Sequence, residues 1–330
     1  MLRLIMNHVC VIYLILEVCS PPLKCKLMKY CSIIIGAFLF ASCGQSSVTE
    51  QKGSFADARK SFTTKIVKTV TLHSEPETPP AEQYRLVAYP GPIGNMPAYL
   101  SNIPQDGKLR PAMIWITGGW GNDIGDVWTP QEAEDDQSAA AIGEAGVIMM
   151  YPAQRGGNTS PGSDEICYGE IDDIIAAAQY LAKQPGVDPK RIYLGGHSTG
   201  GTKAILAAEA SKLFRATFSF GAVAEIQDYG TEVFTFEKNK KELEMRSPAA
   251  WLASLNAPLF VFEGTDGNLD GLKYLEDIAK KENNKYTHFY ELKGEDHFSG
   301  LQKSCKLIGE KIIADSGAVV NINITTGDLH

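Results

Sequence analysis

A strand that runs straight into a glycine-rich turn constrains the fold more than any other feature of this sequence. Residues 191–194 (Arg-Ile-Tyr-Leu) lead into residues 195–201 (Gly-Gly-His-Ser-Thr-Gly-Gly), which contain the pattern G-x-S-x-G around Ser198. So sharp a turn into a helix needs small residues two positions before and after the serine, and it strains the serine backbone. The dinucleotide pattern G-x-G-x-x-G does not fit here, and no phosphate-loop lysine follows. The junction predicts a serine hydroxyl held above a sheet at the start of a helix.

The rest of the chain alternates between strand-like and helix-like segments. Continuous apolar runs predict buried strands, and apolar residues at helical spacing predict helices between them. The expected strands are 112–117, 147–151, 191–194, 216–223, 258–263 and 287–292, and the expected helices are 138–144, 170–183, 200–213, 269–280 and 300–313. Repeated units of this kind predict an α/β fold with a mostly parallel, doubly wound sheet.

Two regions, one near the N-terminus and one after the strand 216–223, depart from this alternation. Ile66–Leu72 and Tyr84–Tyr89 are expected to form antiparallel N-terminal strands joined by a proline-rich turn, with a further short strand at Ala98–Ser101. Residues 225–257 are longer than a simple crossover, so they predict either a small cap over the sheet or a decorated connection. Within them, Pro248–Leu255 looks helical.

Composition excludes several classes of protein. The chain has 330 residues, of which 44% are hydrophobic and 21% charged, as is typical of a globular protein. A formal net charge of −8 without a basic cluster argues against nucleic acid as the main partner. No run of about 18 apolar residues occurs, which excludes a multi-pass membrane protein. We find no Cys/His cluster for a metal and expect no cofactor.

Residues 28–43 follow the pattern of a signal peptide. A lysine is followed by an apolar run from Ile33 to Phe40 and by small residues before Cys43. The ending Phe-Ala-Ser-Cys resembles a bacterial lipobox, which implies cleavage before Cys43 and lipid on that residue. An ordinary signal peptide or an uncleaved anchor is the alternative. We therefore expect a lipoprotein held to a membrane on the periplasmic or cell-surface side.

This interpretation divides the chain into three parts. Residues 1–42 are expected to be a leader, and because residues 1–27 fit a signal badly, translation from Met28 is one hypothesis. Residues 43–64 are polar and flexible enough for a tether, and we expect residues 65–330 to form the domain that carries Ser198. Beyond the leader only Cys167 and Cys305 remain, as a disulfide or as two lone thiols.

The serine needs a base, and the predicted base is His297. It lies in residues 294–300 (Gly-Glu-Asp-His-Phe-Ser-Gly), after the last expected strand and before the last helix, from where it could reach Ser198. His73 and His288 sit within or beside strands, where a structural role is expected. His197 flanks the serine on the turn itself.

The base in turn needs a carboxylate, for which Asp266 is the predicted residue. It comes just after the strand 258–263, whereas Asp270 begins a helix and is better explained as its N-cap. The order Ser198, Asp266, His297 is the triad order of α/β-hydrolases. Asp270 remains the alternative acid.

Backbone N–H groups near the serine would stabilise an oxyanion. Thr199 supplies one at the helix N-terminus, and Gly119 or Trp120, after the strand 112–117, supplies the second. The alternative for residues 117–120 is a plain turn.

Together these residues resemble the α/β-hydrolase superfamily, and most closely the catalytic domain of prolyl oligopeptidase-like (S9) serine hydrolases. The likeness covers about residues 85–315 and rests on five features: 117–120 (Thr-Gly-Gly-Trp), 151–157 (Tyr-Pro-Ala-Gln-Arg-Gly-Gly), the expected helix 170–183 before 187–192 (Val-Asp-Pro-Lys-Arg-Ile), 195–201, and 295–297 (Glu-Asp-His). It implies a serine hydrolase with Ser198, Asp266 and His297 as triad. Thr117 stands where the family has His, and residues 264–267 (Gly-Thr-Asp-Gly) are one residue tighter than the common acid loop.

The resemblance supports the chemistry more than peptide specificity. About 65 residues before the core are too few for the β-propeller of the true oligopeptidases. We expect a small-molecule ester or a peptide as substrate, with esterase and peptidase both open. The alternative from another class is a binding lipoprotein on a hydrolase scaffold without turnover.

Overall fold

The computed structural model describes residues 53–329, and its centre is one eight-stranded sheet. The predicted leader and Cys43 lie outside the described residues. Along the chain the strands are β1 (Tyr84–Gly91), β2 (Gly94–Ser101), β3 (Arg110–Ile116), β4 (Ile148–Pro152), β5 (Val187–His197), β6 (Thr217–Phe220), β7 (Leu259–Gly264) and β8 (Thr287–Leu292).

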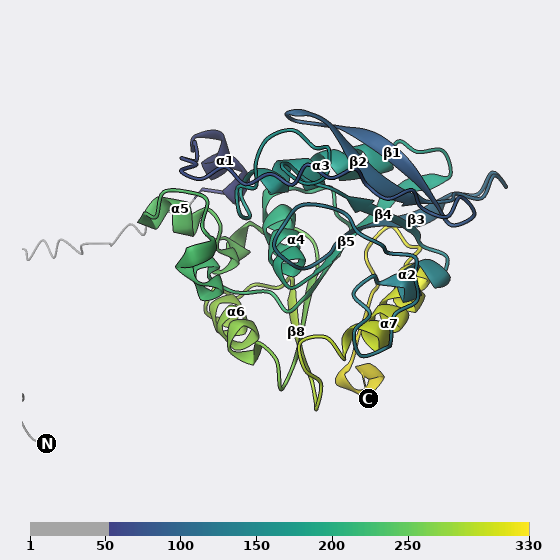
Figure 1. Cartoon of the computed structure of the whole chain (residues 1–330). Helices are drawn as coiled ribbons and strands as arrows, with labels where there is room; N and C mark the ends of the chain where they lie inside the picture. Colours follow the sequence, from purple (N-terminus) through teal and green to yellow (C-terminus); the bar gives the residue numbers. More distant parts are fainter. Residues whose placement is uncertain (1–52, 330) are drawn as a thin grey trace, which may run out of the picture. The chain divides into compact units, whose positions relative to one another are not determined.

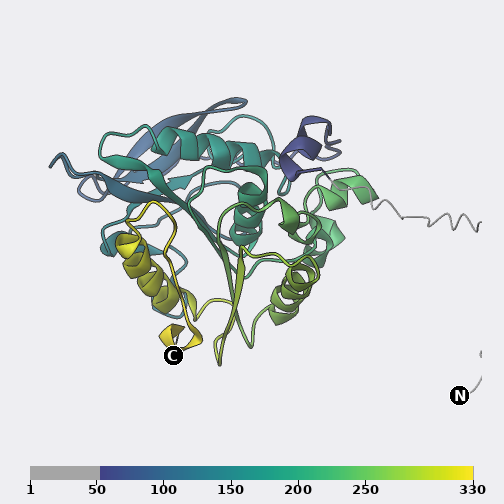
Figure 2. The same ribbon diagram turned by 180° about the vertical axis from the view of Figure 1, so that it is seen from behind.

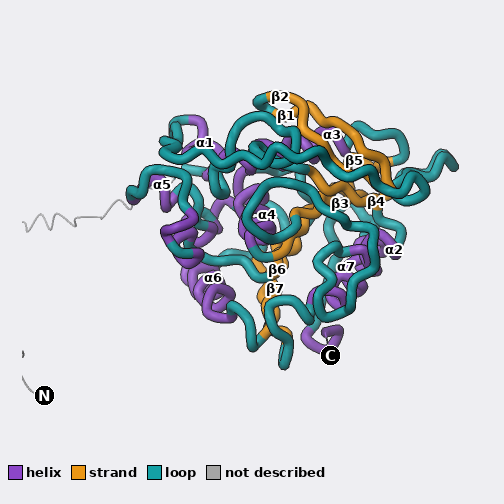
Figure 3. The backbone as a smooth tube through the Cα atoms, in the orientation of Figure 1, coloured by secondary structure: helices purple, strands orange, loops and turns teal. Residues whose placement is uncertain are grey.

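The sheet is mostly parallel. Its order is β1-β2-β4-β3-β5-β6-β7-β8, and the strands from β4 to β8 pair in parallel, whereas β1 with β2 and β2 with β4 pair antiparallel. Figure 3 shows these strands as one continuous orange layer crossing the molecule. The predicted α/β class with antiparallel N-terminal strands is thus confirmed.

Helices cover both faces of the sheet. They are α1 (Phe55–Lys60), α2 (Ala140–Glu144), α3 (Gly169–Leu181), α4 (Thr199–Ala210), α5 (Lys240–Glu244), α6 (Leu269–Lys281) and α7 (Leu301–Ala314). Figures 1 and 2 show α6 and α7 on opposite sides of the strands, with α2 beside α7. Parallel strands need such crossover helices, which bury both faces.

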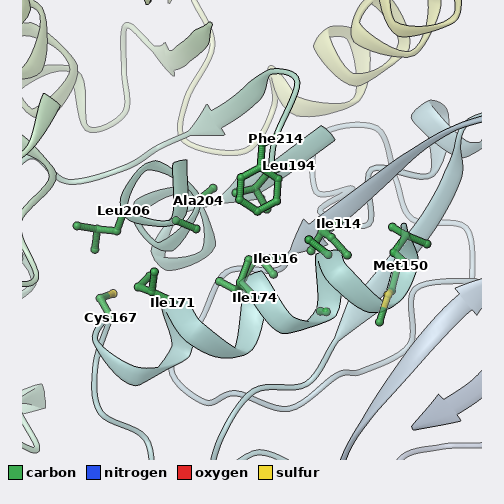
Figure 4. Close-up of a cluster of buried hydrophobic side chains, with 14 of the residues drawn as sticks. Ile114, Ile116, Met150, Cys167, Ile171, Ile174, Leu194, Ala204, Leu206 and Phe214 are labelled. Carbon is green, nitrogen blue, oxygen red and sulfur yellow. The ribbon is translucent and has the colours of Figure 1, made fainter. Parts of the chain in front are cut away.

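Strand β3 shows how the sheet divides the core into two. Ala112, Ile114 and Ile116 face a cluster that includes residues of α3 and α4, part of which Figure 4 draws. Met113 and Trp115 face the opposite cluster, which includes residues of α2 and α7. Successive side chains of a strand point to opposite faces, so a strand between two helical layers must be apolar throughout. This is why the continuous apolar runs predicted the central strands correctly.

The N-terminal strand pairing differs from the prediction. Ile66–Leu72 forms no strand, and its one bridge joins Ile66 to Phe236. Tyr84–Gly91 instead pairs with Gly94–Ser101 in a tight hairpin. Val67 and Leu72 are 60% and 42% exposed, so the segment lacks the buried face that would fix it in the sheet.

Two further segments pack into the main core. Within the predicted tether, Ser54 caps α1, and Phe55 is fully buried and stacks on Trp251 at a ring-centroid distance of 4.9 Å. The described part of the tether is therefore held against the domain rather than free. In residues 225–257, short 3₁₀ turns replace the helix expected over Pro248–Leu255. Phe234 and Phe236 of this segment join the same core.

Cys167 and Cys305 are both free thiols and both buried. Burial raises the pKa of the Cys167 thiol to about 12 and that of Cys305 still further. Of the two possibilities left by the sequence, the structure has the lone thiols.

Candidate active site

Ser198 occupies the predicted junction between β5 and α4. Its backbone has φ 55° and ψ −119°, a strained conformation for a residue with a side chain. The N–H of Ser198 donates to the carbonyl of Phe220 in β6 at 2.8 Å, which holds the turn against the neighbouring strand.

The glycines around the serine are required for space. A Cβ at Gly196 would lie 2.4 Å from the carbonyl oxygen of Gly200, and one at Gly200 would lie 2.1 Å from that of Ile116. Both distances are far below any real carbon–oxygen contact, so neither position accepts a side chain. The G-x-S-x-G pattern therefore has the steric origin that the sequence predicted.

His297 lies in the loop between β8 and α7 and points toward the end of the sheet. A Cβ at Gly221, which follows β6, would lie 2.3 Å from Cε1 of His297, so the ring rests on this glycine. Nδ1 is 3.2 Å from Oε2 of Glu263, which leaves Nε2 for another partner. Among the described residues, no hydrogen bond joins Ser198 Oγ to His297. Catalytic hydrogen bonds are often long in free enzymes and tighten with substrate.

The carboxylate that contacts His297 is Glu263, not Asp266. Glu263 lies in β7 and is 4% exposed, and its Oε1 accepts the N–H of Gly264 at 2.8 Å. Asp266 is exposed within the turn that the Gly267 N–H closes on the Gly264 carbonyl at 3.0 Å. Asp270 is exposed in the first turn of α6.

The sequence analysis looked for the acid after the strand and missed Glu263 within it. The tight turn at residues 264–267 carries Asp266 into solvent before it can face the imidazole. The available signal was a carboxylate closing an otherwise apolar strand, because a buried carboxylate needs a partner.

The predicted oxyanion residues lie together on two elements. The Thr199 hydroxyl donates to the carbonyl of Gly119 at 2.7 Å, which ties the loop after β3 to the start of α4. The N–H groups of Thr199, Gly119 and Trp120 make no hydrogen bond with other residues in the described part of the chain. Gly119 has φ +101°, a conformation that favours glycine.

The Gly119 carbonyl also sets the direction of the next N–H group. In a trans peptide the C=O and the following N–H point in opposite directions, so the N–H of Trp120 points away from the Thr199 hydroxyl. The Trp120 side chain is 50% exposed and meets Tyr229 edge-on at 5.1 Å between ring centroids.

Buried polar contacts fix the far end of this loop. The Asn122 side chain donates to the Arg155 carbonyl and to Glu170, and accepts from Lys203 of α4 at 2.7 Å. Nearby, burial and the charge of Glu170 raise the pKa of Asp164 to about 7. The loop that carries Gly119 is thus bonded to α4 at both ends.

No group of three His, Cys, Asp or Glu residues within 53–329 is arranged to hold a metal ion. In the same range, each helix is too short or too polar to cross a membrane.

The sequence comparison identifies a family, and the structure comparison identifies a fold. The profile of the prolyl oligopeptidase family matches residues 134–306. A search of the curated proteins finds no significant match. A puromycin-hydrolyzing peptidase of Mycobacterium tuberculosis aligns with TM-score 0.56 and 19% identity over 70% of this chain and 39% of that one. An acylaminoacyl peptidase of Pyrococcus horikoshii gives 0.61 and 16% over 76% and 44%. Esterase 2 of Thermogutta terrifontis gives 0.55 and 17% over 75% and 98%.

The fold, with these structural neighbours, is that of an α/β-hydrolase, as the sequence predicted. The matched region is more than half of the chain, and the chain belongs to the prolyl oligopeptidase family, peptidase S9. It spans about two fifths of the length of the two peptidases, 39% and 44%.

Proposed function

We propose that this protein is a serine hydrolase that cleaves an ester or amide bond through an acyl-enzyme. The observation that carries the proposal is the pairing of a strained serine at a strand–helix turn with a histidine bonded to a buried carboxylate. Nδ1 of His297 donates to Glu263, which leaves Nε2 free to accept a proton. In this proposal the triad is Ser198, His297 and Glu263.

The reaction follows from these positions. Ser198 Oγ attacks the substrate carbonyl carbon while His297 Nε2 takes the hydroxyl proton. His297 then gives that proton to the leaving alcohol or amine, and the acyl group stays on Ser198. A water molecule, deprotonated by the same nitrogen, attacks the acyl-enzyme and releases the acid. Glu263 holds the ring in the required tautomer and stabilises its positive charge.

The oxyanion would be stabilised by the N–H groups of Thr199 and Gly119. Both N–H groups lack a partner within residues 53–329, as donors to a transient oxyanion should. The N–H of Trp120 points away from the Thr199 hydroxyl, so Gly119 is favoured over Trp120 as the second donor.

The substrate class is proposed as a small ester or a short peptide-like amide. The structural neighbours include esterases as well as peptidases. Profiling acyl esters against aminoacyl amides would separate the two.

A fluorophosphonate probe tests the chemistry directly. The purified protein should be labelled on Ser198, and Ser198→Ala should abolish labelling while circular dichroism shows an intact fold. An unlabelled, folded wild-type protein would overturn the proposal and favour a binding protein without turnover. Ester turnover that His297→Ala removes would exclude that alternative.

We also propose that Cys43 carries a lipid that anchors the protein to a membrane on the periplasmic or cell-surface side. The signal-like residues 28–43 support this. Cells grown with an alkyne fatty acid should yield labelled protein in the membrane fraction, and Cys43→Ala should lose the label. Label that persists in this variant would contradict the proposal.

A further inference from the structure

We propose that His197 is a positioning residue, which holds the main chain of His297 and so sets the catalytic ring relative to Ser198. The inference rests on the proposed function. It concerns a side chain that the mechanism above does not use, although it directly precedes the nucleophile.

His197 contacts His297 through both its ring and a hydrogen bond. The side chain is fully buried, and its Nε2 lies 2.9 Å from the carbonyl oxygen of His297. The two rings lie 4.7 Å apart between centroids, and His197 also meets the ring of Phe298 at 5.2 Å. Within residues 53–329, this hydrogen bond ties the His297 main chain to the strand–helix turn that carries Ser198.

The polarity of this contact is set by its acceptor. A carbonyl can only accept, so Nε2 of His197 must carry the hydrogen. Burial, with the neighbouring charge of His297, lowers the pKa of His197 to about 4, so the ring is neutral at pH 7. A neutral ring has one N–H, which leaves Nδ1 to accept. The Gln137 atom nearest to Nδ1, at 3.1 Å, is Oε1, so the Gln137 amide must turn by 180° to present its NH₂ group as the donor to Nδ1.

The loop is also held to the turn after β7, where the N–H of Asp266 donates to the Glu295 carbonyl at 3.0 Å and the N–H of Gly294 donates to the Thr265 hydroxyl at 2.9 Å. Neither of these contacts ties the loop to the turn that carries Ser198. Asp296 bonds the N–H groups of Phe298 and Ser299, which stiffens the loop only within itself. Glu263 holds the ring of His297 but not its backbone. Gly294, with φ +75°, begins the loop. Without the His197 side chain, the His297 carbonyl loses its hydrogen-bond donor. The distance between this loop and the turn that carries Ser198 is then less well fixed.

The consequence is a rigid connection between nucleophile and base. His197 and Ser198 are consecutive residues, so a hydrogen bond from the first fixes the histidine that the second must reach. Reacting groups displaced by about 1 Å can lose about 100-fold in rate. A positioning role therefore predicts a fall in kcat with little change in KM.

His197→Phe keeps a buried ring and removes the donor, whereas His197→Gln keeps an N–H at the same distance from the backbone. We expect His197→Phe to lower kcat for a reactive ester by about 10- to 100-fold with KM within about 2-fold. His197→Gln should recover most of that loss. His288→Phe, which alters a histidine in β8 whose side chain makes no hydrogen bond within residues 53–329, should leave kcat unchanged.

Wild-type kcat in folded His197→Phe would overturn the inference, as would a His197→Gln variant no better than His197→Phe. If His197→Phe does not fold, His197→Asn, whose amide is too short to reach the carbonyl, takes its place against His197→Gln. A folded wild type without turnover would remove the proposed function and this inference with it. An active wild type with an unaffected His197→Phe would remove this inference alone.

Discussion

Replacing Glu263 with Gln tests which carboxylate orients His297 in the proposed triad. The carboxylate of Glu263 accepts two hydrogen bonds, from the N–H of Gly264 at 2.8 Å and from Nδ1 of His297 at 3.2 Å. A glutamine amide has only one oxygen for these two donors. If the oxygen stays with Gly264, the amide NH₂ faces Nδ1 and forces the ring into the wrong tautomer. If it turns to His297, the NH₂ group opposes the N–H of Gly264.

Glu263→Gln also removes the negative charge that attracts a protonated His297, in addition to disturbing the hydrogen bonds of residue 263. The imidazolium forms only after His297 has taken the serine proton, so its attraction to Glu263 acts in the transition state. For unit charges 3.2 Å apart at an effective dielectric constant of about 20, this attraction is about 5 kcal/mol. Since about 1.4 kcal/mol is a factor of ten in rate, the upper bound is nearly four orders of magnitude. We expect Glu263→Gln to lower kcat by about 10²- to 10⁴-fold, with KM within about 3-fold.

Asp266→Asn is the matched control, because it makes the same chemical change at an exposed carboxylate three residues away. Hydrolysis of a chromogenic ester by both variants, with circular dichroism to confirm folding, decides between them. We expect Asp266→Asn to stay within about 2-fold of wild type. A large loss in Asp266→Asn together with near-normal turnover in Glu263→Gln would refute the assignment of Glu263.

Three other predictions follow from buried groups. Because the pKa of Asp164 is raised to about 7, its ionisation destabilises the folded state as pH rises from about 4 to 7. Urea unfolding should therefore show Asp164→Asn gaining up to about 3 kcal/mol relative to wild type between pH 5 and pH 8, and equal pH dependence would contradict this. Thr199→Val removes the hydroxyl bonded to Gly119 and should lower kcat about 3- to 10-fold, with recovery in Thr199→Ser. Iodoacetamide should alkylate Cys167 and Cys305 only after unfolding, as peptide masses would show.

The sequence predicted those parts of the fold that depend on local pattern. The runs 112–117 and 147–151 are apolar at every position, or nearly so, and they form β3 and β4. The segment Ile66–Leu72 has the composition of a strand, but strand formation depends on a neighbour, and the sheet edge is taken by the hairpin of β1 and β2. The first residues of β2, Gly-Asn-Met-Pro, look like a turn, so its full length was not predicted.

The site residues also divide into those that a local sequence pattern predicts and those that depend on contacts between distant residues. Ser198 is predicted from its motif because the motif is a local steric requirement. Glu263 carries a weaker signal, a carboxylate that closes an apolar strand, because whether it or Asp266 faces His297 depends on the path of the turn at residues 264–267. The contact between His197 and the His297 carbonyl joins residues 100 positions apart in sequence, and no local pattern reports it.

The close packing of the strand–helix turn around Ser198 also limits which substitutions this fold can accept. A methyl group on residue 200 would press on β3 at Ile116, and one on Gly201 would come within 2.4 Å of the Phe220 carbonyl in β6. Either substitution would push neighbouring strands apart. Correct folding and the position of the Ser198 hydroxyl therefore both depend on the small space beside Gly200 and Gly201. Directed evolution of new substrate preferences should therefore leave this turn invariant and accumulate its changes in the surrounding loops.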